Sequence, residues 1–533
     1  MRAELGLAAA ARRCLPVMLS ATLAACVVGE DYQPPQIDLP EKFASGAGAP
    51  VPDRALAPWW ENFGDKRLNA LVKRGLSENL DVRQAMERVI AAQAVADAAG
   101  APADLDAALG AAVSGGSGSA RVRSATAGLS ASWLLDFVGR YRRSRESASA
   151  RLDAAYADVD VARLVYLSNI VSAYIDARFF QERIALKKKE LESRRYTLQS
   201  TRTLLSAGSA TRLDVLQVEG LVNSTLSDLP PLETGFFRSA HRIATLLGLP
   251  AATLRAELSK GAPQPIPRAR IASGVPADLL RIRPDIRSDE RRLAAAVAEV
   301  GIAQAQMYPS VSLLGSVTAT AVSPGASGST WSFGPSIDIP ILDNGRRRAN
   351  VAVAEATARE RYLAWRSTVL AAVEEVENAL AAIGRDRRTI AAARNSVEAY
   401  EKALELALTS FVIGEATFLE ILDAERSLAT ARTTLARSRR QLALDYVALN
   451  IASGGGYNAA TDVKPARAAV AAAAREAPAD RGDPVAVRVV KPGETVYRIA
   501  LQSGVSVDAL AKFNGISPPY TIRVGQRLMI PPR

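Results

Sequence analysis

The strongest constraint on this chain is a long internal repeat, in which one residue pattern returns after 206 residues (from 208 to 414). The matching segments are Gly208-Ser-Ala-Thr211-Arg-Leu-Asp214 with Gly414-Glu-Ala-Thr417-Phe-Leu-Glu420, and Gly139-Arg140 with Gly345-Arg346. A duplication of this length predicts a single architecture built from two similar halves, at about 66–247 and about 279–453.

Each half contains a run of 68 residues between two of these glycines, at 140–207 and 346–413. The first run has neither Gly nor Pro, and only Gly384 interrupts the second. Both runs are rich in Ala, Leu, Arg and Glu, which favour helix. A helix of this size spans roughly 100 Å, which is more typical of a coiled coil than of a compact globule. Shorter helices are predicted to follow at about 211–247 and 417–452.

The turn after each long helix carries stop and start signals. Gly208 and Gly414 suit the left-handed residue that ends a helix, and Thr211 and Thr417 suit the N-cap of the next one. An acid three residues later suits the reciprocal position of a capping box. We therefore expect two helical hairpins with tight tips. Short helices at about 66–99 and 279–306 would complete the shorter arms, with the irregular segment 248–278 at a waist.

Two segments of different composition, about 102–136 and 309–343, are predicted to be β-hairpins. Each has a Gly- and Ser-rich cluster flanked by alternating stretches, and Val311 to Val322 is the better strand candidate. Two strands of about 10–12 residues match a membrane-spanning hairpin, although an ordinary soluble hairpin is an open alternative. Two hairpins cannot close a barrel, so membrane insertion would require several chains to share one.

The N-terminus predicts export and lipid anchoring. Residues 1–25 combine three arginines with a short apolar run, and their last three residues, Leu23-Ala-Ala25, directly precede Cys26. This layout is typical of a secretory signal, and its ending resembles a bacterial lipobox with cleavage before Cys26 and lipidation of its thiol. An ordinary signal peptide or short membrane anchor is the alternative. By resemblance to lipoprotein sorting, Val27 after the cysteine points to the outer membrane.

Composition excludes several classes of function. The chain has one histidine, His241, and two cysteines, of which Cys14 would leave with the signal. No zinc site, histidine-based catalytic site or nucleotide-binding glycine loop can be assembled, so we expect no enzyme activity, cofactor or metal. The net charge is +11, or about +9 after removal of the signal, but the basic residues are dispersed along helices. Nucleic-acid binding is therefore not expected.

Several landmarks over about residues 26–453 together resemble the TolC-like outer-membrane efflux family, in its lipoprotein branch. They are Cys26-Val-Val-Gly29-Glu-Asp31-Tyr32-Gln-Pro-Pro35, Trp59-Trp60-Glu-Asn-Phe63-Gly-Asp65, Leu71 to Asp81, Gly274 to Asp285 with Arg283-Pro284-Asp285, Gly301 to Pro309, and Ile337 to Gly345. Glu30 departs from this pattern, because a proline is usual there. The resemblance implies a homotrimer in which each chain gives four strands to a twelve-stranded outer-membrane barrel, below which a long α-helical barrel crosses the periplasm. It also implies a passive exit duct that works with a periplasmic adaptor and an inner-membrane pump of the proton-driven RND type.

The same resemblance suggests two functional regions on the hairpins. Glu420 and Asp423 share one helix face, and they correspond to acids that line the closed periplasmic gate, although a capping role alone explains Glu420. The tips are predicted to dock the adaptor, with turning the chain as the plainer role. The tip residues are Gly208, Ser209, Thr211, Gly414, Glu415 and Thr417.

A second module follows the core. Residues 454–484 predict a linker, and its last 28 residues, 457–484, are rich in Ala, Pro and charge and have a coil reach of roughly 30 Å. Residues 485–533 resemble a lysin motif (LysM), a small βααβ domain that binds N-acetylglucosamine polymers, so peptidoglycan is the expected ligand. The implied glycan-binding residues are Gly493, Glu494, Thr495, Ile516, Ser517, Pro518, Tyr520 and Ile522. Weak sugar binding, or binding of a protein, is the alternative.

Three other functions are alternatives to a small-molecule duct. A trimeric tether between outer membrane and cell wall would suit the lipobox and the lysin motif, but it leaves the hairpins and the acidic pair unexplained. A duct that exports proteins stays open. A cell-wall hydrolase lacks a catalytic constellation in the first 450 residues.

Overall fold

The computed structural model describes residues 27–44, 58–99, 103–114, 122–268, 276–323, 325, 327–457, 486–490, 496–503, 507–516 and 526–530. The chain divides into two compact units, Met1–Arg467 and Ala468–Arg533, which we describe separately. The first unit is mainly helical with one four-stranded sheet, and this confirms the predicted fold class.

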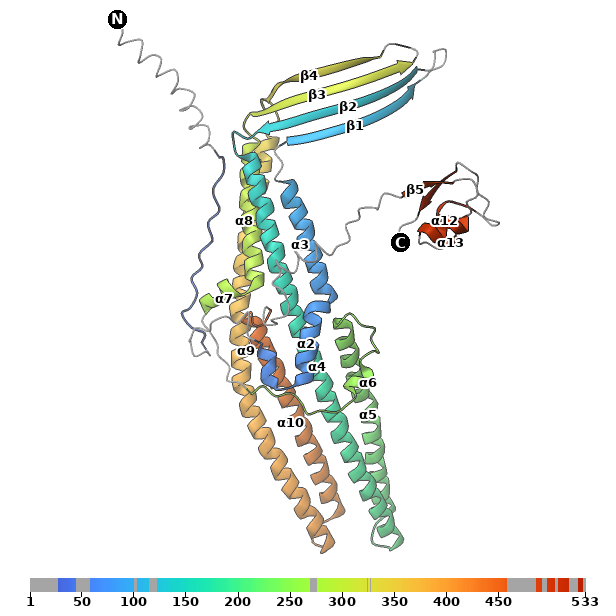
Figure 1. Cartoon of the computed structure of the whole chain (residues 1–533). Coiled ribbons are helices and arrows are strands. Elements are labelled where there is room, and N and C mark those ends of the chain that lie inside the picture. Colours follow the sequence, from blue (N-terminus) through green and yellow to red (C-terminus); the bar gives the residue numbers. More distant parts are fainter. Residues whose placement is uncertain are drawn as a thin grey trace. The chain divides into compact units, whose positions relative to one another are not determined.

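The first unit repeats one order of elements (Figure 1). The first half contains η2 Trp59–Phe63, α2 Lys66–Glu78, α3 Leu80–Ala98, β1 Ala103–Ser114, β2 Val122–Leu135, α4 Arg140–Ser206 and α5 Arg212–Leu246. After α6 Arg255–Leu258, the second half contains α7 Pro276–Ile282, α8 Pro284–Ala305, β3 Ser310–Ser323, β4 Gly328–Asp338, α9 Arg346–Val412 and α10 Phe418–Ala452. Helices α4 and α9 have 67 residues each, so the predicted long helices are confirmed and Gly384 does not break α9.

The helix expected at 66–99 is two helices, because Asn79 ends one and starts the next. Its side chain accepts hydrogen bonds from the backbone N–H groups of Asp81 (3.0 Å) and Val82 (3.1 Å), as an N-cap does. Its amide also donates to the Leu246 carbonyl oxygen at 2.8 Å, so this buried side chain ties the break to the end of α5. The overall composition of 66–99 did not predict this break, because a single residue, Asn79, separates the two helices.

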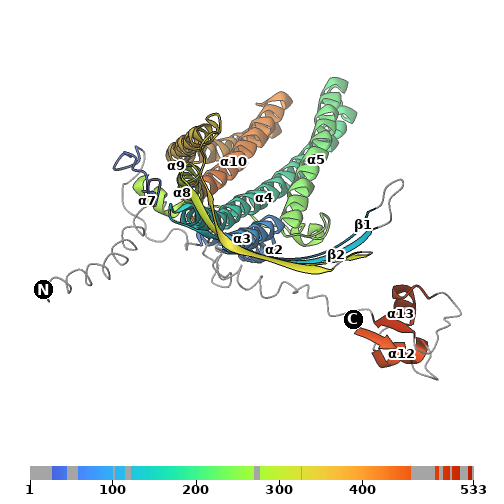
Figure 2. The ribbon, with the colours of Figure 1, turned by 90° about the horizontal axis from the view of Figure 1, so that it is seen from above.

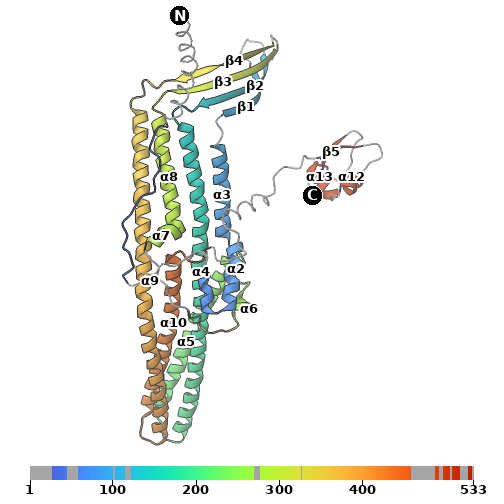
Figure 3. The same cartoon turned by 60° about the vertical axis from the view of Figure 1, so that its left-hand side comes forward.

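The helices pack in a different order at their two ends (Figure 3). Near the sheet, the neighbouring pairs are α3–α4, α4–α8 and α8–α9; near the hairpin tips they are α5–α4, α4–α10 and α10–α9. Helix α4 therefore joins the two halves along most of its length. The buried face of α9 follows a heptad spacing through Trp365, Val369, Ala372, Val376, Ala379 and Ile383, as in a coiled coil.

The four strands form one antiparallel sheet in the order β1-β2-β3-β4, at the end of the helices away from the hairpin tips (Figures 1 and 2). The central pair β2–β3 joins strands from the two halves, with Leu129 opposite Val317. β1 and β4 are the edges of the sheet. None of the helices in the described ranges combines the length and the apolar composition needed to span a bilayer.

The second unit is a small separate domain made of β5 Ala486–Val489, α12 Val496–Ser503, α13 Val507–Phe513 and β6 Arg527–Ile530. β5 and β6 are antiparallel, which gives the βααβ order of elements. Its own core contains Val490, Val496, Ile499, Ala500, Leu510 and Leu528. The Asn514 side chain holds β6 by accepting from the Met529 N–H and donating to the Met529 carbonyl oxygen, both at 2.7 Å.

Candidate functional site

Both hairpin tips have the same backbone hydrogen bonds, which explains the repeated sequence. The N–H groups of Gly208 and Ser209 donate to Leu205 and Leu204 carbonyl oxygens at 3.0 and 2.8 Å, and the second tip repeats these bonds. This pattern is a Schellman motif, in which the glycine takes a left-handed conformation; φ is 74° at Gly208. The predicted capping boxes follow at the start of α5 and α10.

The tips are exposed, and their surfaces are open. A Cβ atom added at Gly208 or Gly414 would meet no heavy atom within 4 Å. The remaining predicted tip residues, Ser209, Thr211, Glu415 and Thr417, are also exposed. Sequence reasoning missed one further feature of the tips: Leu213 and Leu419 occupy equivalent repeat positions and are 62% and 66% exposed. The sequence did contain a signal for this feature: both copies of the repeat have a leucine at the start of the returning helix.

The predicted gate acids have different local partners. The Glu420 carboxylate accepts from the Thr417 backbone N–H at 3.1 Å, which is the capping role. The Asp423 carboxylate is exposed and pairs with the Arg426 guanidinium at 2.5 Å, a partner that sequence reasoning did not name. At the other tip, hydrogen bonds from the Thr211 backbone and side chain lower the pKa of Asp214. The helix places Glu420 and Asp423 three residues apart on one face.

The register of the sheet separates apolar from polar residues. Odd-numbered residues are paired with odd-numbered residues on β2, β3 and β4, and alternate residues of a strand point to opposite faces. Apart from residues near the strand ends such as Arg123 and Ser329, the odd face carries Ala125, Ala127, Leu129, Ala131, Trp133, Leu135, Val311, Leu313, Gly315, Val317, Ala319, Ala321, Trp331, Phe333, Pro335 and Ile337. The even face is mostly Ser, Thr and Gly, and the Ser316 and Ser332 hydroxyls share a hydrogen bond of 2.8 Å. Trp331 and Phe333 are 79% and 71% exposed, so none of the residues that the structure describes covers the apolar face there.

Residues 27–44 form an extended strap that begins at the junction of sheet and helices. The Val28 N–H donates to the Val138 carbonyl oxygen at 3.1 Å, and the Arg143 guanidinium donates to the carbonyl oxygens of Val28 and Gly29 at 3.2 and 2.6 Å. Far along the strap, Phe43 is buried in the cluster around α9. Cys26, the predicted lipidation site, lies outside the described residues.

Arg283, from the landmark Arg283-Pro284-Asp285, lies where the start of α8 meets α9 and the end of α10. We call this junction the waist. The Arg283 guanidinium donates to Asp285 at 3.0 and 2.6 Å, to Glu375 of α9 at 2.6 Å and to the Ala452 carbonyl oxygen at 2.8 Å. Burial acts to lower the pKa of Arg283, but the hydrogen bonds and charges of Asp285 and Glu375 raise it above its ordinary value. Arg283 therefore stays charged and ties α8 to α9 and α10.

The predicted glycan-binding residues are mostly outside the described part of the second unit. These are Gly493, Glu494, Thr495, Ser517, Pro518, Tyr520 and Ile522. Ile516 is described: it packs against the domain core, and its N–H donates to the Ala511 carbonyl oxygen at 2.9 Å. Within the described ranges of the whole chain, no group of three or more His, Cys, Asp or Glu is placed to hold a metal ion.

Known proteins with similar sequences are outer-membrane and export proteins. The chain is 46% identical to nodulation protein T of Rhizobium leguminosarum bv. viciae over 86% of this chain and 96% of that protein. It is 33% identical to the pyoverdine export outer membrane protein OpmQ of Pseudomonas putida, over 75% and 88% of the two chains. It is 27% identical to the cation efflux system protein CusC of Escherichia coli K12, over 83% and 99%.

The structure is similar to solved outer-membrane channels. The outer-membrane channel OprN matches 81% of this chain and 100% of its own, with a TM-score of 0.73 and 34% identity. The CusC channel matches with a TM-score of 0.67 and 27% identity. The model of the outer membrane efflux protein family matches residues 71–249 and 275–455, and that of the LysM domain matches residues 489–531. The chain therefore belongs to the outer membrane efflux protein family and carries a LysM domain after the family core.

Proposed function

We propose that three copies of this chain form one outer-membrane exit duct, with four strands from each chain making a shared barrel of twelve (3 × 4) strands. The observation that carries this proposal is the sheet, which has two unpaired edges, one exposed apolar face and one Ser- and Thr-rich face. Open sheet edges are not tolerated in a bilayer, so four strands require partners from other chains. The apolar face would contact lipid, and the polar face would line the pore.

The strand lengths fit this arrangement. β2 and β3 have 14 residues each, or about 48 Å at about 3.4 Å per residue. A tilt of about 45° reduces this length to about 34 Å along the membrane normal, close to the hydrocarbon thickness of about 30 Å. The 67-residue helices would then extend about 100 Å into the periplasm as the wall of an α-helical barrel.

Transport through this duct would be passive, with energy from an inner-membrane pump of the RND type and a periplasmic adaptor as the connection. Membership of the efflux family supports this role. The relatives' names refer to pyoverdine, to cations and to nodulation, so they support small-molecule export without selecting one substrate.

Discrete single-channel openings of the purified protein in planar bilayers would support a duct. A silent protein would favour the alternative of a structural tether between membrane and wall, for which the LysM domain is the supporting feature.

We assign the periplasmic gate to Glu420 and Asp423, which would place six (3 × 2) carboxylates in one ring and favour cations. The ion pair with Arg426 gives a sharp test. Asp423→Asn removes a charge at almost constant size and should reduce the cation preference measured from reversal potentials. Arg426→Gln frees the Asp423 charge and should increase it. If both variants leave the reversal potential unchanged, these residues do not line the gate.

The hairpin tips are assigned to the adaptor. Their exposure and the open space around both glycines support close approach of another protein, and the exposed Leu213 and Leu419 offer apolar contacts at equivalent places. Bulky substitutions at Ser209 and Glu415 should reduce adaptor crosslinking and efflux in cells. Arg195→Trp, at an exposed position away from the tips on α4, is the matched control. Full crosslinking in both tip variants would remove this assignment.

The LysM domain is assigned to peptidoglycan, and its chain leaves the core at the waist. Tyr457 is buried there, and its hydroxyl donates to the Ile282 carbonyl oxygen at 3.0 Å. The 28 residues from 458 to 485 cannot span more than about 100 Å, which limits how far from Tyr457 the domain can bind wall material. The full chain should sediment with purified peptidoglycan, and a chain ending at Tyr457 should not. Equal sedimentation of the two would exclude this role.

A further inference from the structure

The strap shows where the membrane surface would lie on this chain. A Cβ atom at Gly139 would approach Val27 Cγ1 to 2.6 Å, so Val27 rests directly on the start of α4. Cys26, the predicted lipidation site, immediately precedes Val27 in the sequence. Just before Gly139, Trp133 and Phe137 are 48% and 43% exposed, as expected for side chains that meet lipid.

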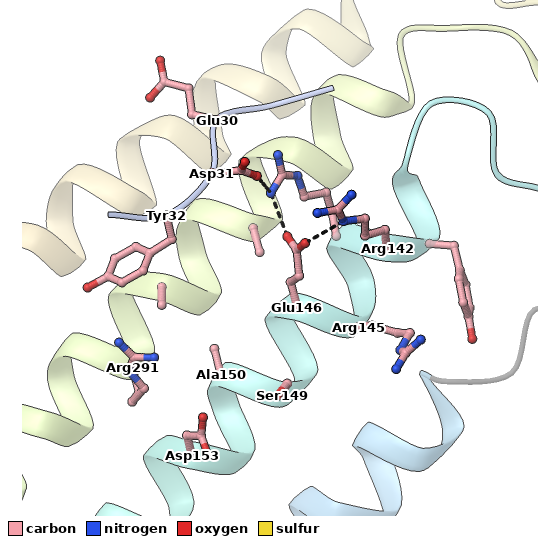
Figure 4. A pocket seen from close by; sticks show the side chains of 14 residues that line it. Glu30, Asp31, Tyr32, Arg142, Arg145, Glu146, Ser149, Ala150, Asp153 and Arg291 are labelled. Carbon is pink, nitrogen blue, oxygen red and sulfur yellow. Dashed lines mark hydrogen bonds and ion pairs between the residues drawn. The ribbon is translucent and has the colours of Figure 1, made fainter. Parts of the chain in front are cut away.

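A cavity of about 770 Å³ lies directly below this level, between the strap, α4 and α8 (Figure 4). Three of its lining residues, Tyr141, Arg142 and Arg145, are one, three or four residues apart and share one side of the first turns of α4. None of the three belongs to a sequence landmark named above.

These three side chains have unused binding capacity. The Tyr141 hydroxyl is buried and has no hydrogen-bond partner among the described residues. Arg145 is exposed and forms no ion pair within the described part of the chain, and Figure 4 draws no contact at its guanidinium. Arg142 pairs with Glu146 at 3.1 Å, but its side chain remains 60% exposed. In contrast, Arg143 is buried and is occupied by Asp31, Glu146 and the strap.

The depth of the two exposed arginines matches the headgroup layer of a membrane. Arg142 and Arg145 follow Gly139 by three and six residues, or about 4.5 and 9 Å along the helix. The polar layer on each side of a bilayer is about 5–8 Å thick. Helical side chains lean toward the N-terminus of the helix, which here is the membrane side, and long arginine side chains extend their charge to the interface.

We propose that Tyr141, Arg142 and Arg145 bind the phosphate of a glycerophospholipid in the leaflet that receives the lipid anchor. Guanidinium groups bind phosphate through paired, charge-assisted hydrogen bonds, and the orphan hydroxyl of Tyr141 supplies a further donor. A lipid is favoured over a soluble phosphate because exposed apolar residues continue from Phe137 toward the sheet, where acyl chains would lie. The inference rests on the proposed insertion of the sheet into the membrane.

The test uses the full-length protein in mild detergent, with short-chain phosphatidylglycerol as the probe and native mass spectrometry as the readout. The double variant Arg142→Ala/Arg145→Ala should bind the lipid about tenfold more weakly or worse. Tyr141→Phe should weaken binding by a smaller factor. Arg195→Ala, an exposed arginine 50 residues further along α4, should bind normally. Arg142→Lys/Arg145→Lys keeps the charges but loses the paired donors, so its binding should fall between that of the native chain and that of the double alanine variant.

Two outcomes would overturn the proposal. One is equal lipid binding by the native chain and the double alanine variant. The other is competition by inorganic phosphate as strong as that by the lipid, which would assign the site to a soluble anion. Channel conductance separates this inference from the proposed function, because both arginines lie away from the gate. Weak lipid binding in a native chain that still conducts would reject the lipid site alone, whereas a silent native chain would count against the duct.

Discussion

Replacing Arg283 by methionine tests whether one buried charge holds the waist together. The side chain is 10% exposed and donates to two carboxylates and one carbonyl oxygen from three segments. Removing one partner of a buried ion pair costs about 3–5 kcal/mol. Because Glu375 is 54% exposed and regains water, we expect the lower end, about 3 kcal/mol. For a unit this large, that loss corresponds to a decrease of about 3 °C in melting temperature.

The assay is loss of helical circular dichroism on heating the detergent-solubilised protein, at one scan rate because unfolding of such proteins is often irreversible. Arg359→Met is the matched control: its pair with Glu355 is 3.9 Å long, with Arg359 69% exposed, and should be worth less than about 0.5 kcal/mol. Arg283→Lys keeps the charge but loses the fork of donors, so it should fall between the two. If Arg283→Met and Arg359→Met have the same melting temperature, the buried network does not stabilise the waist.

Two further predictions concern stability. Gly75→Ala should destabilise the protein by about 1–3 kcal/mol, because its new Cβ would lie 1.9 Å from the Tyr166 hydroxyl, whereas Gly384→Ala has open space and should stabilise it slightly; similar melting temperatures for both would refute the packing argument. Burial and a hydrogen bond with Asp445 raise the pKa of Asp386 to about 6. Its ordinary value is 3.8, so the folded protein holds a proton that the unfolded chain has lost, and stability should fall as pH rises from about 4 to 6. Asp386→Asn should remove that part of the pH dependence and melt higher than the native chain above pH 6; identical melting curves from pH 4 to 8 would contradict the shift.

The position of Asp386 shows how the helices limit what sequence reasoning can find. It follows Ile383 by three residues and so continues the heptad face of α9, where apolar residues are expected. The sequence alone makes it one of many acids on a charged helix. Only the packing of α10, which brings Asp445 beside it, makes it a titrating group.

Local signals in the sequence determined the repeated architecture. Glycines bound each long helix, and the threonine and acid after each tip start the next helix through hydrogen bonds between residues at most four apart. Such bonds depend on neighbouring residues alone, so they are legible without a fold. The sequence landmarks also predicted the family and the outer-membrane location, which the comparisons confirm.

Contacts between distant segments decided the rest. The common register of β2, β3 and β4 produces one apolar face, although the strands come from two halves of the chain. Arg283 joins residues 92 and 169 positions away, and the strap encloses a cavity against α4 more than 100 residues later. A sequence pattern fixes which residues share a helix face or strand face. Which faces then meet depends on packing of the whole unit, and only the tertiary structure supplies that.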